Sequence, residues 1–449
     1  MLSLVLASVR TRLGQYVGVL LVSAMSAGLL TLLSSVLDSV HHADPGHRAE
    51  RSAQSLLGLV GGTSGFAALL LVANTLALVA QQRRTEIGAL RVIGATTVQI
   101  RIQVVSEAAV VAALGGMAGA ACGAVALGPV LDWLIEHHVL PAGPQPDFSP
   151  LGFAVGLLST IVIAIPAALT AVRGPLRSSA VAALREATVE RRTLPVGRAI
   201  TAVVMLLLAW AVWDRYARKS GAHEALNGAM ALCMLLMIAA WLLLPLVVRP
   251  VAALSALPGW LLSRCTGRLA AANSASAGRR VAAMAGPVLL AAGLSAMLLC
   301  GNAVSQATAA AHDTLQQESN AVGLRILMTP MVICAALGIL NTLLLATRQR
   351  RGEFAALRLA GSTRAQMLRM LGWESVVVVL SGLLTAGLVI GLFLAGLSAR
   401  IAPYLTEVPA VLPWAGLAEV VVGCAGLGLL GVLVPGVLVL RVNAVHAVE

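Results

Sequence analysis

Two stretches of the chain carry the same pattern of charged residues, glycine and threonine, and they hold the side chains best placed to do chemistry. Residues 74–107 and 341–374 align without a gap at an offset of 267, with 15 of 34 positions identical. The charged and structural positions that the two copies share are Arg83, Arg84, Glu86, Leu90, Arg91, Gly94, Thr96 and Glu107 in the first copy, and Arg350, Arg351, Glu353, Leu357, Arg358, Gly361, Thr363 and Glu374 in the second. The chain shows no motif that pairs a nucleophile with a base, so this pattern favours binding and mechanical coupling over catalysis.

The central part of each copy predicts a rigid elbow. In the first copy, residues 83–93 are typical of a short amphipathic helix that lies along a membrane surface. Its apolar face would consist of Ile87, Leu90 and Ile93. Gly94 then predicts a helix stop, and Thr96 with Gln99 predicts a capping box that begins the next membrane helix. Gly361, Thr363 and Gln366 repeat this order. Such an elbow could pass a push on the surface helix into the following span.

The two glutamates that close the repeat allow two interpretations. Glu107 and Glu374 are expected at the membrane interface near the cytoplasmic starts of their helices, favoured by the helix N-terminus and paired with elbow arginines such as Arg91 and Arg358. The alternative is that they are functional carboxylates inside the membrane.

The composition places these elements in a lipid bilayer. Of the 449 residues, 59% are hydrophobic and 11% are charged, whereas a soluble chain would carry about 25% charged residues. Aromatic residues make up 3% of the chain, so the net charge of +12 lacks the aromatic interleaving of a nucleic-acid-binding surface, and no nucleic-acid partner is predicted. Ten runs are long and apolar enough to span the membrane. They lie near residues 16–37, 56–80, 104–131, 150–172, 199–213, 227–248, 286–304, 326–347, 372–397 and 415–440.

The basic residues indicate how these spans are oriented. With the N-terminus inside, 24 of the 31 arginines and lysines fall in cytoplasmic segments, as the positive-inside rule requires. Both termini are therefore expected in the cytoplasm. Both basic elbows must also lie there, so the repeats are parallel and an even number of spans separates them.

These observations predict an all-α polytopic membrane protein with ten transmembrane helices arranged four, two, four, and with small extracytoplasmic loops. Residues 1–187 would form the first four-helix unit with a cytoplasmic tail, residues 188–269 a two-helix linker region, and residues 270–449 the second four-helix unit. Glycines spaced by four in the third helix of each unit permit close packing and are expected to mark the contact between the units. They are Gly115, Gly119, Gly123, Gly387 and Gly391.

The duplicated motifs RRTEIGALRVIGAT and RRGEFAALRLAGST, each followed by a glutamate near the start of the next helix, resemble the FtsX-like permease family, the MacB-type (type VII) membrane subunits of ABC transporters. With the four-helix units around them, the resemblance covers most of residues 1–172 and 270–449. It implies that the surface helices dock a cytoplasmic ABC ATPase, with two copies per permease. It also implies a bacterial plasma membrane location. Separately, apolar helices with so few intramembrane charges would suit lateral entry of an amphiphile, so the expected exported substrate is a lipid, a peptide or a hydrophobic drug.

The relatives and this chain differ in their extracytoplasmic parts. Those permeases carry a large domain after the first helix of one or both units, whereas the matching loops here run only over residues 38–55 and 305–325. The alternatives are a non-transporting signalling subunit driven by an ATPase, which the small outer loops disfavour, and a secondary transporter. The latter would need ionisable residues near the bilayer midplane.

The sequence also predicts that the chain is not itself an ATPase. Its single lysine, Lys219, follows no glycine-rich turn that could form a P-loop. The chain is thus expected to bind no cofactor, with ATP and Mg²⁺ used by the partner ATPase. No metal site is predicted either, because the outer-loop histidines lack a matching ligand spacing.

Overall fold

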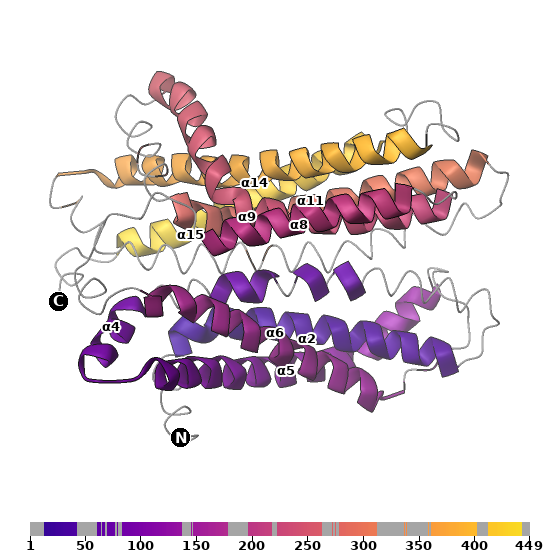
Figure 1. The fold of residues 1–449 in the computed structure, drawn as a ribbon, viewed down its shortest axis with the longest axis horizontal. Helices are drawn as coiled ribbons and strands as arrows, with labels where there is room; N and C mark the ends of the chain where they lie inside the picture. The colour runs from indigo at the N-terminus through magenta and orange to yellow at the C-terminus, as the bar shows by residue number, and fades with distance from the viewer. Residues whose placement is uncertain are drawn as a thin grey trace. The chain divides into compact units, whose positions relative to one another are not determined.

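The computed structural model describes residues 13–42, 61–63, 65–67, 70–76, 79, 83–136, 145, 147–177, 196–217, 222–262, 272, 274, 278–311, 336, 338, 358, 361–401 and 412–441. Within these residues the regular structure is α-helical, with no strand (Figure 1). The helices are α2 (Leu13–His42), α4 (Arg84–Val92), α5 (Thr97–Glu136), α6 (Pro150–Arg177), α8 (Val196–Ala217), α9 (Ala222–Leu262), α11 (Gly278–Ala311), α14 (Arg364–Ile401) and α15 (Trp414–Arg441). The predicted all-α polytopic class is confirmed.

Seven helices of the described chain are long and apolar enough to cross a membrane. They are α2, α5, α6, α8, α9, α11 and α14, and each contains one of the spans expected from hydropathy. Two other expected spans are represented by shorter apolar helices, Gly61–Leu76 and Trp414–Leu430. The expected span at residues 326–347 lies almost entirely outside the described residues.

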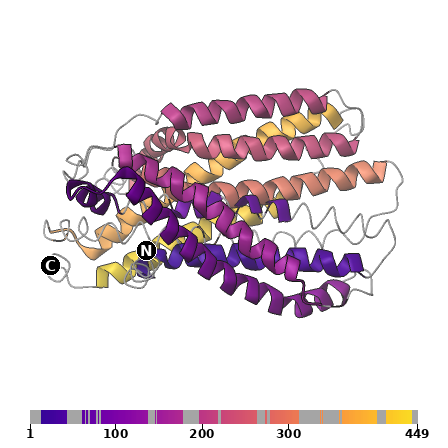
Figure 2. The ribbon, with the colours of Figure 1, turned by 60° about the horizontal axis from the view of Figure 1, so that its bottom comes forward.

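The chain forms two compact units. The first contains Met1–Val189 with Ser319–Asn341, and the second contains Glu190–Glu318 with Thr342–Glu449. In the first unit α2, α5 and α6 pack against one another along their lengths (Figures 1 and 2). Their shared core includes Val19, Val111 and Ala164, each fully buried.

Close packing of α2 against α5 depends on glycine. A Cβ added at Gly115 would lie 2.7 Å from the Leu20 carbonyl oxygen, and Cβ atoms at Gly119 and Gly123 would meet the backbone carbonyls of Ala24 and Gly28. This small-residue face therefore packs inside the first unit, so the expectation that it marks the contact between the units is wrong. In α14 a Cβ at Gly387 or Gly391 would meet nothing within 4 Å.

The second unit repeats this arrangement and adds two helices. Its α11 and α14 pack together as α2 and α5 do, and α15 packs on both. The added helix α9 contacts both α11 and α14, and α8 packs on α9 (Figure 1). Large side chains of the added helices fill the space over glycines, since Cβ atoms at Gly286 and Gly396 would lie 2.8 Å from Trp241 Nε1 and 3.0 Å from the Trp213 ring.

A proline inside α9 explains how α8 is fixed to it. Pro245 has no N–H, so the carbonyl of Trp241, four residues earlier, loses its helical donor. Arg198 of α8 supplies one instead: its Nη2 donates to the Trp241 carbonyl at 2.8 Å and its Nε to the Leu242 carbonyl at 2.8 Å. The guanidinium also lies 5.3 Å from the centre of the Trp241 ring, within the range of a cation–π contact.

Candidate functional site

The first elbow has the local geometry that its sequence predicts. Helix α4 ends in a Schellman turn, because the Ala95 N–H donates to the Leu90 carbonyl at 2.9 Å and the Gly94 N–H donates to the Arg91 carbonyl at 3.2 Å. Gly94 has a φ of 102°, a conformation that an L-residue rarely adopts. The helix stop predicted at this glycine is confirmed.

The capping box that starts α5 is also confirmed. The Gln99 N–H donates to Thr96 Oγ1 at 3.3 Å, and the Thr96 N–H donates to Gln99 Oε1 at 2.9 Å. Only Ala95 lies between Gly94 of the Schellman turn and Thr96 of the capping box. Little backbone freedom is therefore left between α4 and α5.

The second elbow has the same turn and cap in its described part. Gly361 has a φ of 90° and donates its N–H to the Arg358 carbonyl at 3.0 Å. Thr363 and Gln366 exchange the same two hydrogen bonds, at 2.9 and 3.2 Å. The sequence repeat is thus a structural repeat at the residues that end one helix and begin the next.

The apolar face of α4 differs from the predicted one. Ile87 is 3% exposed and packs with Ile100, Val172 and Leu176, while Leu90 packs against this cluster. Ile93 is instead 84% exposed, so its placement on the buried face is wrong. The reason is geometric: a helix turns about 100° per residue, so residues spaced by three drift, and Ile93 lies about 120° around the axis from Ile87.

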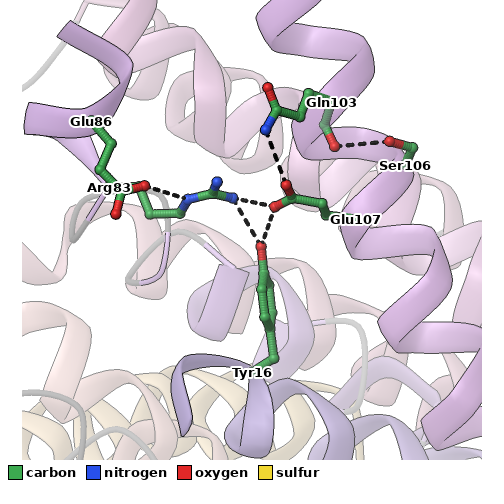
Figure 3. A network of polar contacts seen from close by, with 6 residues as sticks. All are labelled: Tyr16, Arg83, Glu86, Gln103, Ser106 and Glu107. Carbon is green, nitrogen blue, oxygen red and sulfur yellow. Dashed lines mark hydrogen bonds and ion pairs between the residues drawn. The ribbon is translucent and has the colours of Figure 1, made fainter. Parts of the chain in front are cut away.

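A buried polar network fixes this elbow to two membrane helices (Figure 3). Arg83, directly before α4, donates from Nη1 to the Tyr16 hydroxyl at 2.9 Å and to Glu107 Oε2, and from Nε to Glu86 Oε2 at 3.2 Å. Tyr16 of α2 donates to Glu107 Oε2 at 2.6 Å. Gln103, one turn before Glu107 in α5, donates to its Oε1 at 3.2 Å. We call these residues, Tyr16, Arg83, Gln103 and Glu107, the latch.

Three of the four latch residues are buried. Glu107 is 0% exposed, Tyr16 is 2% exposed and Arg83 is 5% exposed. Burial alone would lower the pKa of Arg83, but Tyr16, Glu107 and Glu86 outweigh it and raise the pKa, so the guanidinium stays charged. A buried carboxylate is tolerated only when it is paired and hydrogen-bonded, and three donors meet this need at Glu107.

Glu107 pairs with an elbow arginine, as expected, but this arginine is not the example Arg91. Arg91 does not reach it; its Nη1 donates to the Leu176 carbonyl of α6 at 3.3 Å. Glu107 lies ten residues after Thr97, three turns into α5, where the helix N-terminus has no appreciable field. An elbow arginine does neutralise this carboxylate, but it is Arg83.

The remaining predicted residues are divided between surface and interior. Glu86 is 40% exposed and Thr96 is exposed, whereas Leu90 and Arg91 are half-buried. In the second copy Arg358 and Glu374 are half-buried, and Gly361 and Thr363 are exposed. Arg350, Arg351, Glu353 and Leu357, together with the Arg84 side chain, lie outside the described residues.

Sequence reasoning missed Tyr16 and Gln103. Gln103 had a local signal, because it lies four residues before Glu107 and so shares its helix face. Tyr16 had none, since 67 residues separate it from Arg83.

The cavity that the described residues form beside the latch is small. A cavity of about 10 Å³ lies beside Tyr16, Arg83 and Ile87, enough for at most one water molecule. No group of three His, Cys, Asp or Glu side chains that could hold a metal ion occurs among the described residues. The geometry is that of a mechanical joint between α2, α4 and α5.

Comparison with known proteins agrees with the repeat. The model of one protein family, described as FtsX-like permease C-terminal, matches the chain twice, over residues 58–179 and 325–444. Each match contains one elbow and the helices that follow it. A search of curated proteins finds no match.

Proposed function

Because this chain belongs to the FtsX-like permease family, whose members are ABC-type membrane subunits without ATPase activity of their own, we propose that its two elbows bind a separate cytoplasmic ABC ATPase and carry ATP-driven movement into the membrane helices. The observation that carries this proposal is the exposed apolar end of α4. Val92 and Ile93 are 60% and 84% exposed and lie within the Schellman turn, directly before Gly94.

An exposed apolar tip on a rigid support suits docking into a protein groove. Scattered apolar side chains are normal on a surface, but these two are held in place on both sides: Ile87 anchors α4 in the buried cluster, and the capping box fixes the start of α5. Burying two such side chains in a partner contributes about 2–5 kcal/mol, and little of this is lost to ordering because the elbow is already ordered.

The duplication suggests the stoichiometry. Each repeat supplies one elbow with the same turn and cap, so one permease would bind two ATPase subunits, one at each elbow. ATP-driven approach of the two ATPases would then move the two units. The basic residues that follow the spans favour the cytoplasmic, ATPase-facing side for both elbows.

The proposed cargo is an amphiphile that enters from the bilayer and is exported. The membrane helices present broad apolar faces, including Leu207 and Trp210 of α8 and Val162 of α6, which are 63%, 70% and 66% exposed. A lipid, a peptide or a hydrophobic drug could reach the helices along such faces. ATPase stimulation measured across a panel of these three classes would identify the substrate, and no stimulation by any of them would contradict the proposed cargo.

The docking proposal is tested with full-length permease in lipid nanodiscs and a Walker-motif ATPase, to be sought among the reading frames that flank the permease's own. The native permease should co-purify with the ATPase and raise its hydrolysis rate. Ile93→Glu should lose about 2 kcal/mol or more at the first elbow, which is at least a tenfold weaker complex. It is combined with Ala360→Glu, which introduces a charge at the matching position of the second copy.

The matched control is Phe148→Glu, which removes a side chain that is 66% exposed before α6, at the opposite end of the first unit. This variant should bind and stimulate the ATPase as the native protein does. If the Ile93→Glu and Ala360→Glu permease binds the ATPase as well as the control, the elbows are not the docking sites.

A further inference from the structure

Two residues of the latch have no counterpart of the same type in the second repeat. In the first unit, the latch joins α2, Arg83 and α5 through Tyr16 and Gln103. Gln103 corresponds to Met370 in the gapless repeat, and Met370 is 5% exposed. Methionine has no donor, so this position cannot supply the amide hydrogen bond that Glu107 receives.

The position of Tyr16 is also apolar in the second unit. Gly115 packs on the Leu20 carbonyl and the Ser23 Cβ, and its repeat partner Gly382 packs on the Ala285 carbonyl and the Val288 Cβ. This packing register matches Tyr16 with Val281, a buried residue that is 4% exposed. No residue between 278 and 286 carries a hydroxyl group.

The carboxylates differ in a corresponding way. Glu107 is 0% exposed, whereas its repeat partner Glu374 is half-buried. A carboxylate can be withdrawn fully from water only where enough donors replace its hydration. The fully buried carboxylate of Glu107 and the two donors, Tyr16 and Gln103, therefore occur together in the first unit.

We propose that Tyr16 and Gln103 are positioning residues that make the first elbow the stiffer of the two, so that movement of α4 carries α2 and α5 together, while the second elbow moves more freely relative to α11. The inference rests on the proposed function, since it assigns unequal transmission to the two ATPase docking sites. Two ATPases bound to one chain would then drive unequal movements in its two units.

The asymmetry is tested without an ATPase, by hydrogen exchange of the full-length permease in lipid nanodiscs. The amides of residues 84–96 should exchange more slowly than the matching amides of residues 351–363. The difference should be about tenfold or more, because a hydrogen bond to a buried charge contributes that factor to the opening equilibrium. Equal exchange at the two elbows would overturn the proposal.

The double variant Tyr16→Phe with Gln103→Met gives the first unit side chains without these donors. Its residues 84–96 should exchange at about the rate of residues 351–363, and Tyr216→Phe in α8 should change neither elbow. An unchanged difference between the elbows in the double variant would also overturn the proposal.

A second readout separates positioning from folding. The double variant should bind the ATPase with native affinity, since Val92 and Ile93 are untouched, but should stimulate hydrolysis less. Loss of affinity together with stimulation would show that Tyr16 and Gln103 only maintain the docking surface, contrary to this inference. Absence of ATPase binding by the native permease would instead reject the proposed function and leave the exchange result standing.

Discussion

Arg83 has a different task from the other charged residues of its motif. The arginine pair and glutamates of the elbow all suit a surface that binds a partner, yet the Arg83 guanidinium points inward to Tyr16 and Glu107. At 5% exposed, it is a connector between helices. The exposed side of the elbow instead includes two large apolar residues, Val92 and Ile93.

This role predicts a non-additive pair of substitutions. Arg83→Met should destabilise the permease by about 3–5 kcal/mol, because it leaves the charge of Glu107 buried and uncompensated. Adding Glu107→Gln removes that charge, so the double variant should be more stable than Arg83→Met alone. Thermal unfolding of the detergent-solubilised permease measures both effects.

The control for this prediction is Arg91→Met. The Arg91 side chain is half-buried and donates to one backbone carbonyl at 3.3 Å, so its loss should cost about 0.5–1.5 kcal/mol. Additive effects of the Arg83 and Glu107 substitutions would show that these side chains do not form a coupled buried pair.

At the scale of elements, local sequence signals were sufficient to predict the turn and the cap of the elbow. They were insufficient to predict which residues of other helices the elbow contacts. A glycine at positive φ and a capping box are fixed by neighbouring residues, so Gly94 and Thr96 could be read directly from the sequence. The contact of Tyr16 with Arg83 and the packing of Gly119 on α2 depend on tertiary structure, and neither could be predicted. The exposed position of Ile93 follows from helical drift and was available from geometry alone.

The contacts of helices α8 and α9 could not be predicted from local sequence signals either. Their sequence predicts two spans between the units, whereas the structure packs α9 against α11 and α14 of the second unit. Pro245 could be recognised as a break in the helical hydrogen bonding, but the donor that repairs it, Arg198, comes from the other helix. The two helices therefore form a brace whose joint is this arginine.

The brace predicts a dependence of one substitution on another. Arg198→Met should destabilise the permease by about 1–3 kcal/mol, because the partly buried Trp241 carbonyl that Pro245 leaves without a donor loses its replacement. In a Pro245→Ala background α9 regains its own N–H, and the same Arg198→Met substitution should cost less. Thermal unfolding of the four proteins measures the coupling, and equal costs in the two backgrounds would rule out this account of Arg198.

At the scale of the whole molecule, the charge distribution, the repeat and the family describe one arrangement. Only 11% of the residues are charged, and the charged positions that the two repeats share lie in or near the elbows. Each elbow is followed by a membrane helix that starts at a capping box. The family match covers both copies. The two copies differ at the positions of Tyr16 and Gln103, whose side chains take part in the contacts between helices. The turn and the cap, which depend on neighbouring residues, are the same in both copies.

The proposed contact between the tip of α4 and an ATPase can be tested by photo-crosslinking in membranes. A photo-crosslinking amino acid is placed at Ile93 in the full-length permease, and at Phe148 as the control. The crosslinked proteins are then identified. We predict that a Walker-motif ATPase is captured from Ile93 and not from Phe148. Capture of that ATPase equally from both positions, or from neither while it co-purifies with the permease, would contradict the assignment of the elbow as its docking site.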